Sequence, residues 1–166
     1  NMNSIFHRVS VRKFEPKGIE PEKIEKILSA GMQAPSATNQ QPWEFYVVTN
    51  KDMLAKLGKS GPYSGPASHA PAAIVSVYRK EGLRVPEYAA IDLSIAMENI
   101  WLETDALGLG GVWIGTYPMQ DRMDAVREVL NIPENLEVFA LFPFGYPAET
   151  RPQENRTDPK RIHYVR

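Results

Sequence analysis

The sequence contains no cysteine, and this absence excludes several classes of protein. Disulfide scaffolds, iron–sulfur clusters, thiolate metal sites and cysteine nucleophiles all require that residue. An excess of one charge is also lacking, because 19 basic and 20 acidic residues give a formal net charge of −1. A general nucleic-acid binder usually shows a clear basic excess. We therefore expect no disulfide and no nucleic-acid partner.

Long apolar runs are absent too. No stretch approaches the roughly 20 apolar residues that are needed to span a bilayer. Residues 1–18 are polar and basic and lack the apolar core of a signal peptide. The 166 residues, 43% of them hydrophobic, suffice for one domain with a proper core. We expect a single domain over residues 1–166, located in the cytoplasm and not bound to a membrane.

Familiar catalytic motifs are missing as well. His7, His69 and His163 are far apart in the sequence, and none has the spacing of metal ligands. The chain has no GxSxG nucleophile elbow and no Walker A loop. Demanding chemistry would therefore come from an organic cofactor rather than from a metal or a protein nucleophile.

Hydrophobic periodicity and turn residues predict alternating helices and strands. Helices are predicted over 21–32, 52–57, 88–107 and 120–130, and strands over 43–48, 72–78, 111–114 and 138–144. Residues 59–71, rich in glycine and proline, predict a loop. The spacing is too irregular for a series of βαβ units, so the expected fold class is α+β rather than a doubly wound sheet.

The predicted helix 88–107 is apolar on more than one face. Such a surface indicates packing on two sides, inside the subunit and against a second one. Gly108 follows directly, as expected of a residue that ends a helix in the left-handed conformation.

Three segments are candidates for binding. In an extended segment Arg8, Ser10 and Arg12 would share one side and suit a phosphate, although a solvated basic N-terminus is the simpler interpretation. Residues 34–43 are dense in amides and hydroxyls that could match a heteroaromatic ring, or could form an ordinary polar turn. The glycine-rich 108–115 follows a helix and opens a strand, which excludes a Rossmann loop. It leaves backbone that a flat ligand could approach, or Gly108 and Gly110 could simply end the helix.

These segments together resemble the nitroreductase family of FMN-dependent oxidoreductases. The matching features, in order, are RxSxRxF at 8–14, APSATNQQPW at 34–43, GLGGVWIG at 108–115 and the basic DPKRIHYVR at 158–166. The resemblance spans nearly the whole chain, and the combination is more specific than any single motif. It implies a mixed or antiparallel sheet flanked by helices, and an intertwined homodimer with FMN at the subunit interface around the long central helix.

The resemblance also implies roles for individual residues. Arg8 and Ser10 match positions that hold the FMN phosphate and ribityl chain, and Arg12 matches the basic position near the N1–C2=O edge of the flavin. The other matched positions are Pro35, Ser36 and Ala37 (contact with a flavin bound mainly by the other subunit), Asn39 (pyrimidine edge), Trp113, Ile114 and Gly115 (backbone beside N5), and Lys160 and Arg161 (phosphate).

The implied activity is ping-pong transfer of electrons from NADH or NADPH to a small acceptor such as a nitroaromatic or a quinone. No side chain is expected to be a dedicated acid or base, because the cofactor carries the chemistry. The alternatives are a more specialised flavin enzyme of the same superfamily, a flavin-binding protein without turnover, and a globular protein whose basic and glycine-rich segments only support the fold. The sequence leaves the acceptor, the choice of nicotinamide and the pathway open.

Overall fold

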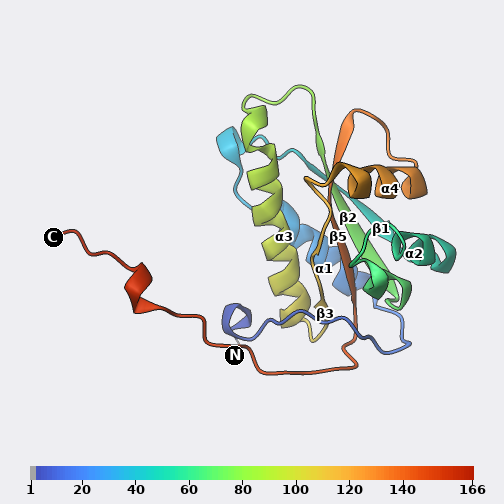
Figure 1. The fold of residues 1–166 in the computed structure, drawn as a ribbon, viewed down its shortest axis with the longest axis horizontal. Coiled ribbons are helices and arrows are strands. Elements are labelled where there is room, and N and C mark those ends of the chain that lie inside the picture. The colour runs from blue at the N-terminus through green and yellow to red at the C-terminus, as the bar shows by residue number, and fades with distance from the viewer. Residues whose placement is uncertain (1–2) are drawn as a thin grey trace.

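Within residues 3–166, five antiparallel strands form the central sheet (Figure 1). The computed structural model describes residues 3–166. Along the sheet the order is β1 (Trp43–Val48), β2 (Ala72–Arg79), β5 (Leu136–Gly145) and β3 (Gly110–Gly111), and β4 (Ile114–Gly115) also pairs with β5. Every pairing between these strands is antiparallel. The expected α+β class is therefore confirmed, and the sheet itself is purely antiparallel.

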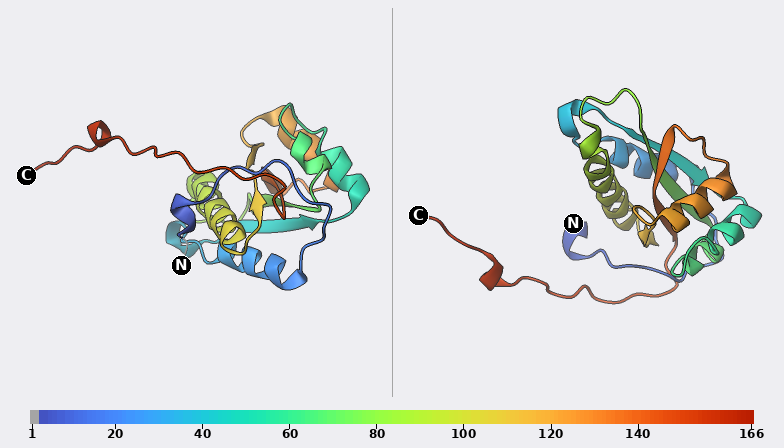
Figure 2. Two further views of the ribbon diagram at one scale, coloured as in Figure 1. Left: turned by 90° about the horizontal axis from the view of Figure 1, so that it is seen from below. Right: turned by 45° about the horizontal axis from the view of Figure 1, so that its top comes forward.

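Two helices cover each face of this sheet (Figures 1 and 2). The helices are α1 (Pro21–Met32), α2 (Lys51–Leu57), α3 (Ala89–Ala106) and α4 (Gln120–Leu130). On β2, Ile74 packs with the α1 and α3 side chains, whereas its neighbour Val75 packs with those of α2 and α4. This alternation is what a strand buried on both faces requires. The sheet thus separates two apolar clusters, each closed by a helix pair.

The predicted elements largely match the observed ones, and the main difference has a physical cause. Instead of one strand over 111–114, the chain forms β3 and β4 with a gap between them. The two pieces keep one register against β5, and between them the Val112 amide donates to the Pro143 carbonyl. Proline has no N–H with which to return that bond, so the ladder is interrupted at this pair.

Smaller differences concern turns and ends. Residues 86–88 form a 3-10 turn before α3 begins, and another 3-10 turn, Gly65–Ser68, lies within the predicted loop 59–71. Strands β2 and β5 are longer than predicted, and α2 begins one residue earlier. Gly108 has φ +80° and ends α3 as expected. Within residues 3–166, every helix is too short or too polar to cross a bilayer.

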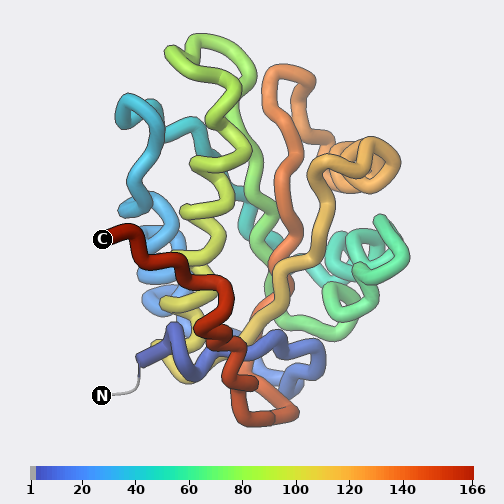
Figure 3. The backbone as a smooth tube through the Cα atoms, turned by 60° about the vertical axis from the view of Figure 1, so that its left-hand side comes forward, coloured from blue at the N-terminus to red at the C-terminus, as the bar shows by residue number. Residues whose placement is uncertain are grey.

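The C-terminal segment runs back along the N-terminal one before it leaves the molecule (Figure 3). The Gln153 side-chain amide donates to the Arg8 carbonyl at 2.6 Å and to the Ile5 carbonyl at 3.0 Å. Beyond this point the tail, residues 154–166, is exposed and extends away from the sheet and helices (Figures 1 and 2). The N-terminal segment is therefore held between strand β3 and the start of the tail.

Candidate functional site

Residues 8–12 dock on the edge of the sheet through backbone bonds. The Val11 amide donates to the Gly111 carbonyl at 2.9 Å, and Ser10 forms a parallel bridge with Gly111. A Cβ on Gly110 would lie 2.7 Å from Cγ2 of Val11, so this approach requires glycine. The expectation that the GLGG backbone lies open to a ligand is thus wrong for Gly110 and Gly111, because the chain's own side chains occupy that space.

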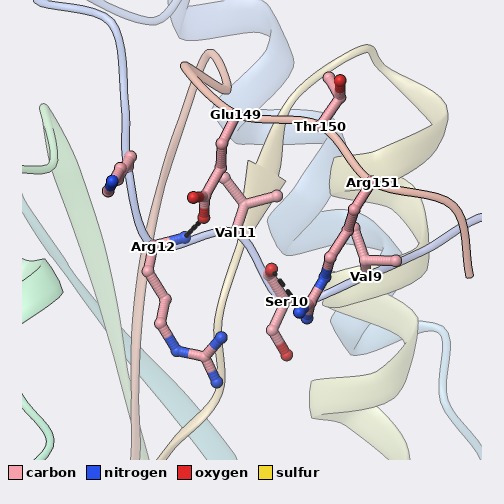
Figure 4. A pocket seen from close by; sticks show the side chains of 8 residues that line it. Val9, Ser10, Val11, Arg12, Glu149, Thr150 and Arg151 are labelled. Atoms are coloured by element: carbon pink, nitrogen blue, oxygen red, sulfur yellow. Dashed lines mark hydrogen bonds between the residues drawn. The ribbon is translucent and has the colours of Figure 1, made fainter.

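Ser10 and Arg12 present their side chains in the same direction, as the extended segment predicts. Figure 4 shows the two side chains extending together, away from Glu149. The buried side chain of Val11 points the opposite way. The Arg12 amide donates to Glu149 Oε1 at 2.9 Å, which holds the backbone while the guanidinium stays exposed. A hydroxyl and a guanidinium therefore share one side of the segment.

Arg8 is ordered by contacts with α3. Its guanidinium carbon lies 4.3 Å from the centre of the Trp101 ring, and its side chain is only 14% exposed. The Trp101 indole N–H donates to the Gly111 carbonyl at 3.2 Å, which joins the ring to β3. Cation–π stacking of this kind holds an arginine in place without neutralising its charge. Arg8 is thus a positioned cation on a rigid aromatic platform.

One carboxylate faces this cation. Glu98 Oε1 lies 3.8 Å from Arg8 Nε, and burial raises the pKa of the Glu98 carboxyl above its ordinary value, with Arg8 acting in the opposite direction. The Glu98 side chain remains 48% exposed, so solvent weakens the ion pair. Arg8 therefore keeps most of its capacity to bind an anion.

A hollow of about 230 Å³ lies between residues 9–13 and 149–151 (Figure 4). Glu149 lines it, and the Arg151 guanidinium, which also lines it, donates to the Ser10 carbonyl at 3.4 Å. Ser10, Arg12 and Arg151 line the same hollow, so its lining contains cations as well as this carboxylate. The Ser10 hydroxyl and the Arg12 guanidinium are donors of the kind that suits an anion.

The amide-rich segment 34–43 forms a strained turn beside the first turn of α3. Thr38, Asn39 and Gln41 have φ values of 51°, 55° and 45°, in the left-handed region. The Ala37 amide donates to Asp92 of α3 at 2.9 Å. Asn39 is exposed, and its side-chain oxygen accepts from the Gln41 amide at 2.7 Å. Left-handed backbone and hydrogen bonds to α3 and within the turn thus distinguish this segment from an ordinary polar turn.

A row of aromatic rings supports Trp113, which lies between β3 and β4. Its ring packs edge to face on Phe139 at 5.8 Å, Phe139 contacts Tyr117 at 5.5 Å, and Tyr117 contacts Tyr78 at 6.3 Å. Burial raises the pKa of Tyr78 to about 12, so this phenol is neutral across the physiological range. The row is aromatic, and its rings pack beneath the backbone that leads from Trp113 into β4.

Backbone that a flat ligand could approach lies at Gly115. This residue is exposed, and a Cβ built on it would meet no atom within 4 Å. Its neighbour Ile114 is buried in the cluster below α2 and α4. Of the glycines in the 108–115 motif, Gly115 is thus the one whose backbone combines strand geometry with open space.

Not all of the predicted site residues come together in one chain. Asp92 and Trp101, which contact the strained turn and Arg8 respectively, are nine residues apart on α3, about 13 Å along its axis. Lys160 and Arg161 lie in the exposed tail, where the contacts of Arg161 include Asp158 at 3.6 Å, and the single chain does not bring them to Arg8.

Sequence reasoning missed Glu98, Trp101 and Asp92 as parts of these surroundings. Acids within an otherwise apolar helix could have drawn attention to Asp92 and Glu98. Partners more than 50 residues apart, such as Ala37 and Asp92, cannot be paired from spacing alone. Within residues 3–166, no three histidine, aspartate or glutamate side chains form a group that could hold a metal ion.

Comparison with known proteins places this geometry in a family. The sequence model of the nitroreductase family matches residues 5–61 and 61–146. A candidate NADH dehydrogenase/NAD(P)H nitroreductase of Archaeoglobus fulgidus is 41% identical, over 98% of this chain and 95% of its own length. Among solved structures, a candidate NADH oxidase of Clostridium acetobutylicum is 40% identical with a TM-score of 0.95, covering 98% of this chain and 99% of its own.

A third similar protein is described as FMN-dependent. An FMN-dependent nitroreductase of Clostridium difficile is 32% identical to this chain, with a TM-score of 0.89. The match covers 99% of this chain and 98% of the other. The similarity therefore extends over the whole fold rather than over one motif.

Proposed function

Because the chain belongs to the nitroreductase family, we propose that it is an FMN-dependent oxidoreductase that takes electrons from NADH or NADPH and passes them to small acceptors, such as nitroaromatics or quinones. One observation carries the cofactor assignment. Ser10 and Arg12 share one side of the docked segment, and Arg8 is held beside it on the Trp101 ring. This set of two guanidinium groups and a hydroxyl suits a phosphate and a ring edge that gathers negative charge.

The predicted site residues would contact different parts of FMN. Arg8 and Ser10 hold the phosphate and ribityl chain of FMN, and Arg12 lies near the N1–C2=O edge. Asn39 pairs with the pyrimidine edge. The remaining contacts come from Pro35, Ser36 and Ala37 on the strained turn, from the backbone of Trp113, Ile114 and Gly115, and from Lys160 and Arg161 on the tail.

The protein contributes binding and electrostatics rather than acid–base chemistry. When bound, FMN supplies hydride transfer between a nicotinamide and the acceptor, in a ping-pong sequence. The Arg12 guanidinium stabilises negative charge at the edge that it faces. The backbone at Gly115 orients the ring without a side chain in the way. Protons for the acceptor come from solvent.

We also propose that two copies of the chain build the site between them. Ile91 and Ile95 on α3 are 54% and 36% exposed, and Tyr164 and Val165 in the tail are 74% and 97% exposed. The first pair lies on the second apolar face of the helix that the sequence indicates. An intertwined homodimer would bury both regions and bring the strained turn of one subunit to the flavin held by the other.

Colour is the first test of this function. The purified protein should be yellow, should release FMN on denaturation, and should lose its flavin absorption when NADH or NADPH is added without oxygen. Colourless protein that also fails to take up added FMN would refute the proposal. Bound FMN that neither donor reduces would favour the specialised or non-catalytic alternatives.

Assembly is tested separately by sedimentation of the FMN-loaded protein, for which we expect a dimer. An FMN-saturated species that sediments as a monomer would contradict the shared site and leave the cofactor assignment intact.

A further inference from the structure

The turn between α1 and β1 contains three side-chain-bearing residues in the left-handed region. Thr38, Asn39 and Gln41 have φ between 45° and 55°. Asparagine adopts this region readily, whereas the β-branched Thr38 does so at a cost. Such strain persists only when the surroundings hold it in place, and it concentrates at functional sites. A turn that served connection alone could use glycine at these positions. The Gln41 side-chain amide donates to Asn39 Oδ1 at 2.7 Å, which fixes the direction of the Asn39 side chain.

The buried carboxylate of Asp92 on α3 is hydrogen-bonded to this turn. Asp92 is 2% exposed, and its Oδ1 accepts from the Ala37 amide at 2.9 Å. Its Oδ2 accepts from the Gln40 side-chain amide at 2.7 Å. A buried carboxylate is costly unless it is hydrogen-bonded, and both oxygens of Asp92 are bonded to the same turn. Asp92 therefore anchors the backbone just before Thr38 and Asn39 and the side chain of Gln40 just after them.

The Gln40 side chain extends this anchor to a third segment. Its Oε1 accepts from the Val85 amide at 3.2 Å, and its Nε2 also donates to the Val85 carbonyl at 3.0 Å. The Arg79 guanidinium donates to the backbone carbonyls of Gln40 and Gln41 at 3.1 and 3.0 Å. Every one of these partners lies outside the turn. These contacts with α3, the end of β2 and the loop before α3 add to bonds within the turn, such as the one from the Gln41 amide to Ser36 Oγ at 3.0 Å.

We propose that Asp92 is a positioning residue of the flavin site, acting through the Ala37 amide and Gln40 to keep residues 36–41 in the one conformation that presents Asn39 to the pyrimidine edge. Asp92 itself touches no part of the cofactor in this arrangement. The inference rests on the proposed function, because it gives a role to a residue behind the turn that the proposed flavin site uses.

The test compares Asp92→Asn and Asp92→Ala with Asp121→Asn. Asp121 is the matched control, because it is also an acid in the first turn of a helix but is exposed and lies on α4. Asparagine keeps an acceptor for the Ala37 amide but places an amide group against Gln40, and alanine removes both acceptors. We expect FMN binding to weaken about tenfold in Asp92→Ala and less in Asp92→Asn. The control should bind like the unmodified protein.

Two further measurements separate positioning from mere support of the fold. Hydrogen exchange of the flavin-free protein should accelerate in the peptide that contains Ala37 and Asn39. The two-electron midpoint potential of the bound flavin should become more negative by about 30 mV, which corresponds to a tenfold loss in relative affinity for the reduced form. Loss of a fixed Asn39 amide produces this shift, because the reduced ring carries more negative charge at the edge that the amide would face.

The outcomes are distinct. If the unmodified protein binds no FMN, the proposed function fails, and this inference fails with it. If it binds FMN but the Asp92 variants match the control in affinity and potential, only the inference is overturned. Weaker binding with an unchanged potential would also overturn it, since Asp92 would then only support the fold. Should Asp92→Ala not fold, Asp92→Asn and Gln40→Met provide the same comparison.

Discussion

The two segments assigned to the flavin, residues 8–12 and residues 36–41, are held in opposite ways. The first is extended, with a backbone that docks on Gly111 and with the side chains of Ser10 and Arg12 on the same side. The second has left-handed residues, and α3, β2 and the loop before α3 hold it through hydrogen bonds. In the first segment, alternation alone sets which side chains face the ligand. In the second, distant partners set the shape of the backbone.

This difference predicts different responses to mutation. A segment whose function depends on individual side chains should lose affinity when those side chains are removed and keep its stability. A segment whose function depends on shape should tolerate loss of an outward side chain, provided that the backbone keeps its conformation. Three substitutions, taken from the largest expected effect to the smallest, test that contrast.

Arg8→Ala removes the positioned cation. We expect FMN binding to weaken by about 1.5–3 kcal/mol, the scale of a hydrogen bond to a charged group. Fluorescence titration of the flavin-free protein measures this. Lys13→Ala is the matched control, because Lys13 is an exposed cation on the same segment and has no part in the proposed site. Equal affinities for the two variants would mean that the phosphate lies elsewhere.

Thr38→Gly relieves strain in the second segment. The φ of 51° suits glycine, so we expect the free energy of unfolding to rise by roughly 1 kcal/mol, with FMN affinity within about twofold of the original. Thr49→Gly provides the control, because Thr49 is exposed and its φ is not positive, and that variant should lose stability. Chemical denaturation measures both. A Thr38→Gly variant destabilised as much as the control would argue against stored strain.

Glu98→Gln removes the carboxylate that faces Arg8. We expect FMN to bind more tightly by about 0.5 kcal/mol at neutral pH, because an exposed ion pair contributes little and competes with the phosphate. Looser binding by Glu98→Gln would show that the carboxylate helps to orient Arg8 rather than competing for it.

Comparison with Glu98→Gln also tests how the stability of the protein depends on pH. The pKa of Glu98 is raised above 4.5, so its contribution to stability is present below the unfolded value and is lost as pH rises through the folded value. Relative to Glu98→Gln, the unmodified protein should therefore lose stability as pH rises from below 4.5 to neutrality. Parallel stability curves for the two proteins would contradict the raised pKa.

Much of the fold could be predicted because local patterns dominate it. The bounds of α1, α4 and β1 follow from periodicity and from proline placement, and Gly108 ends α3 where a left-handed residue was expected. The gap between β3 and β4 could not be predicted in the same way. It arises where Val112 meets Pro143, and that pairing exists only once β5 has taken its place in the sheet.

The sequence by itself determined that Ser10 and Arg12 face the same way, because alternation is a local property of extended backbone. It also predicts, through a helix apolar on more than one face, that α3 packs against a second subunit as well as against its own sheet. Only the tertiary structure decided that Trp101 carries Arg8, that Gly110 makes room for Val11, and that Asp92 anchors the turn at residues 36–41. These contacts join residues far apart in the chain, and no local pattern specifies which of many buried partners will meet.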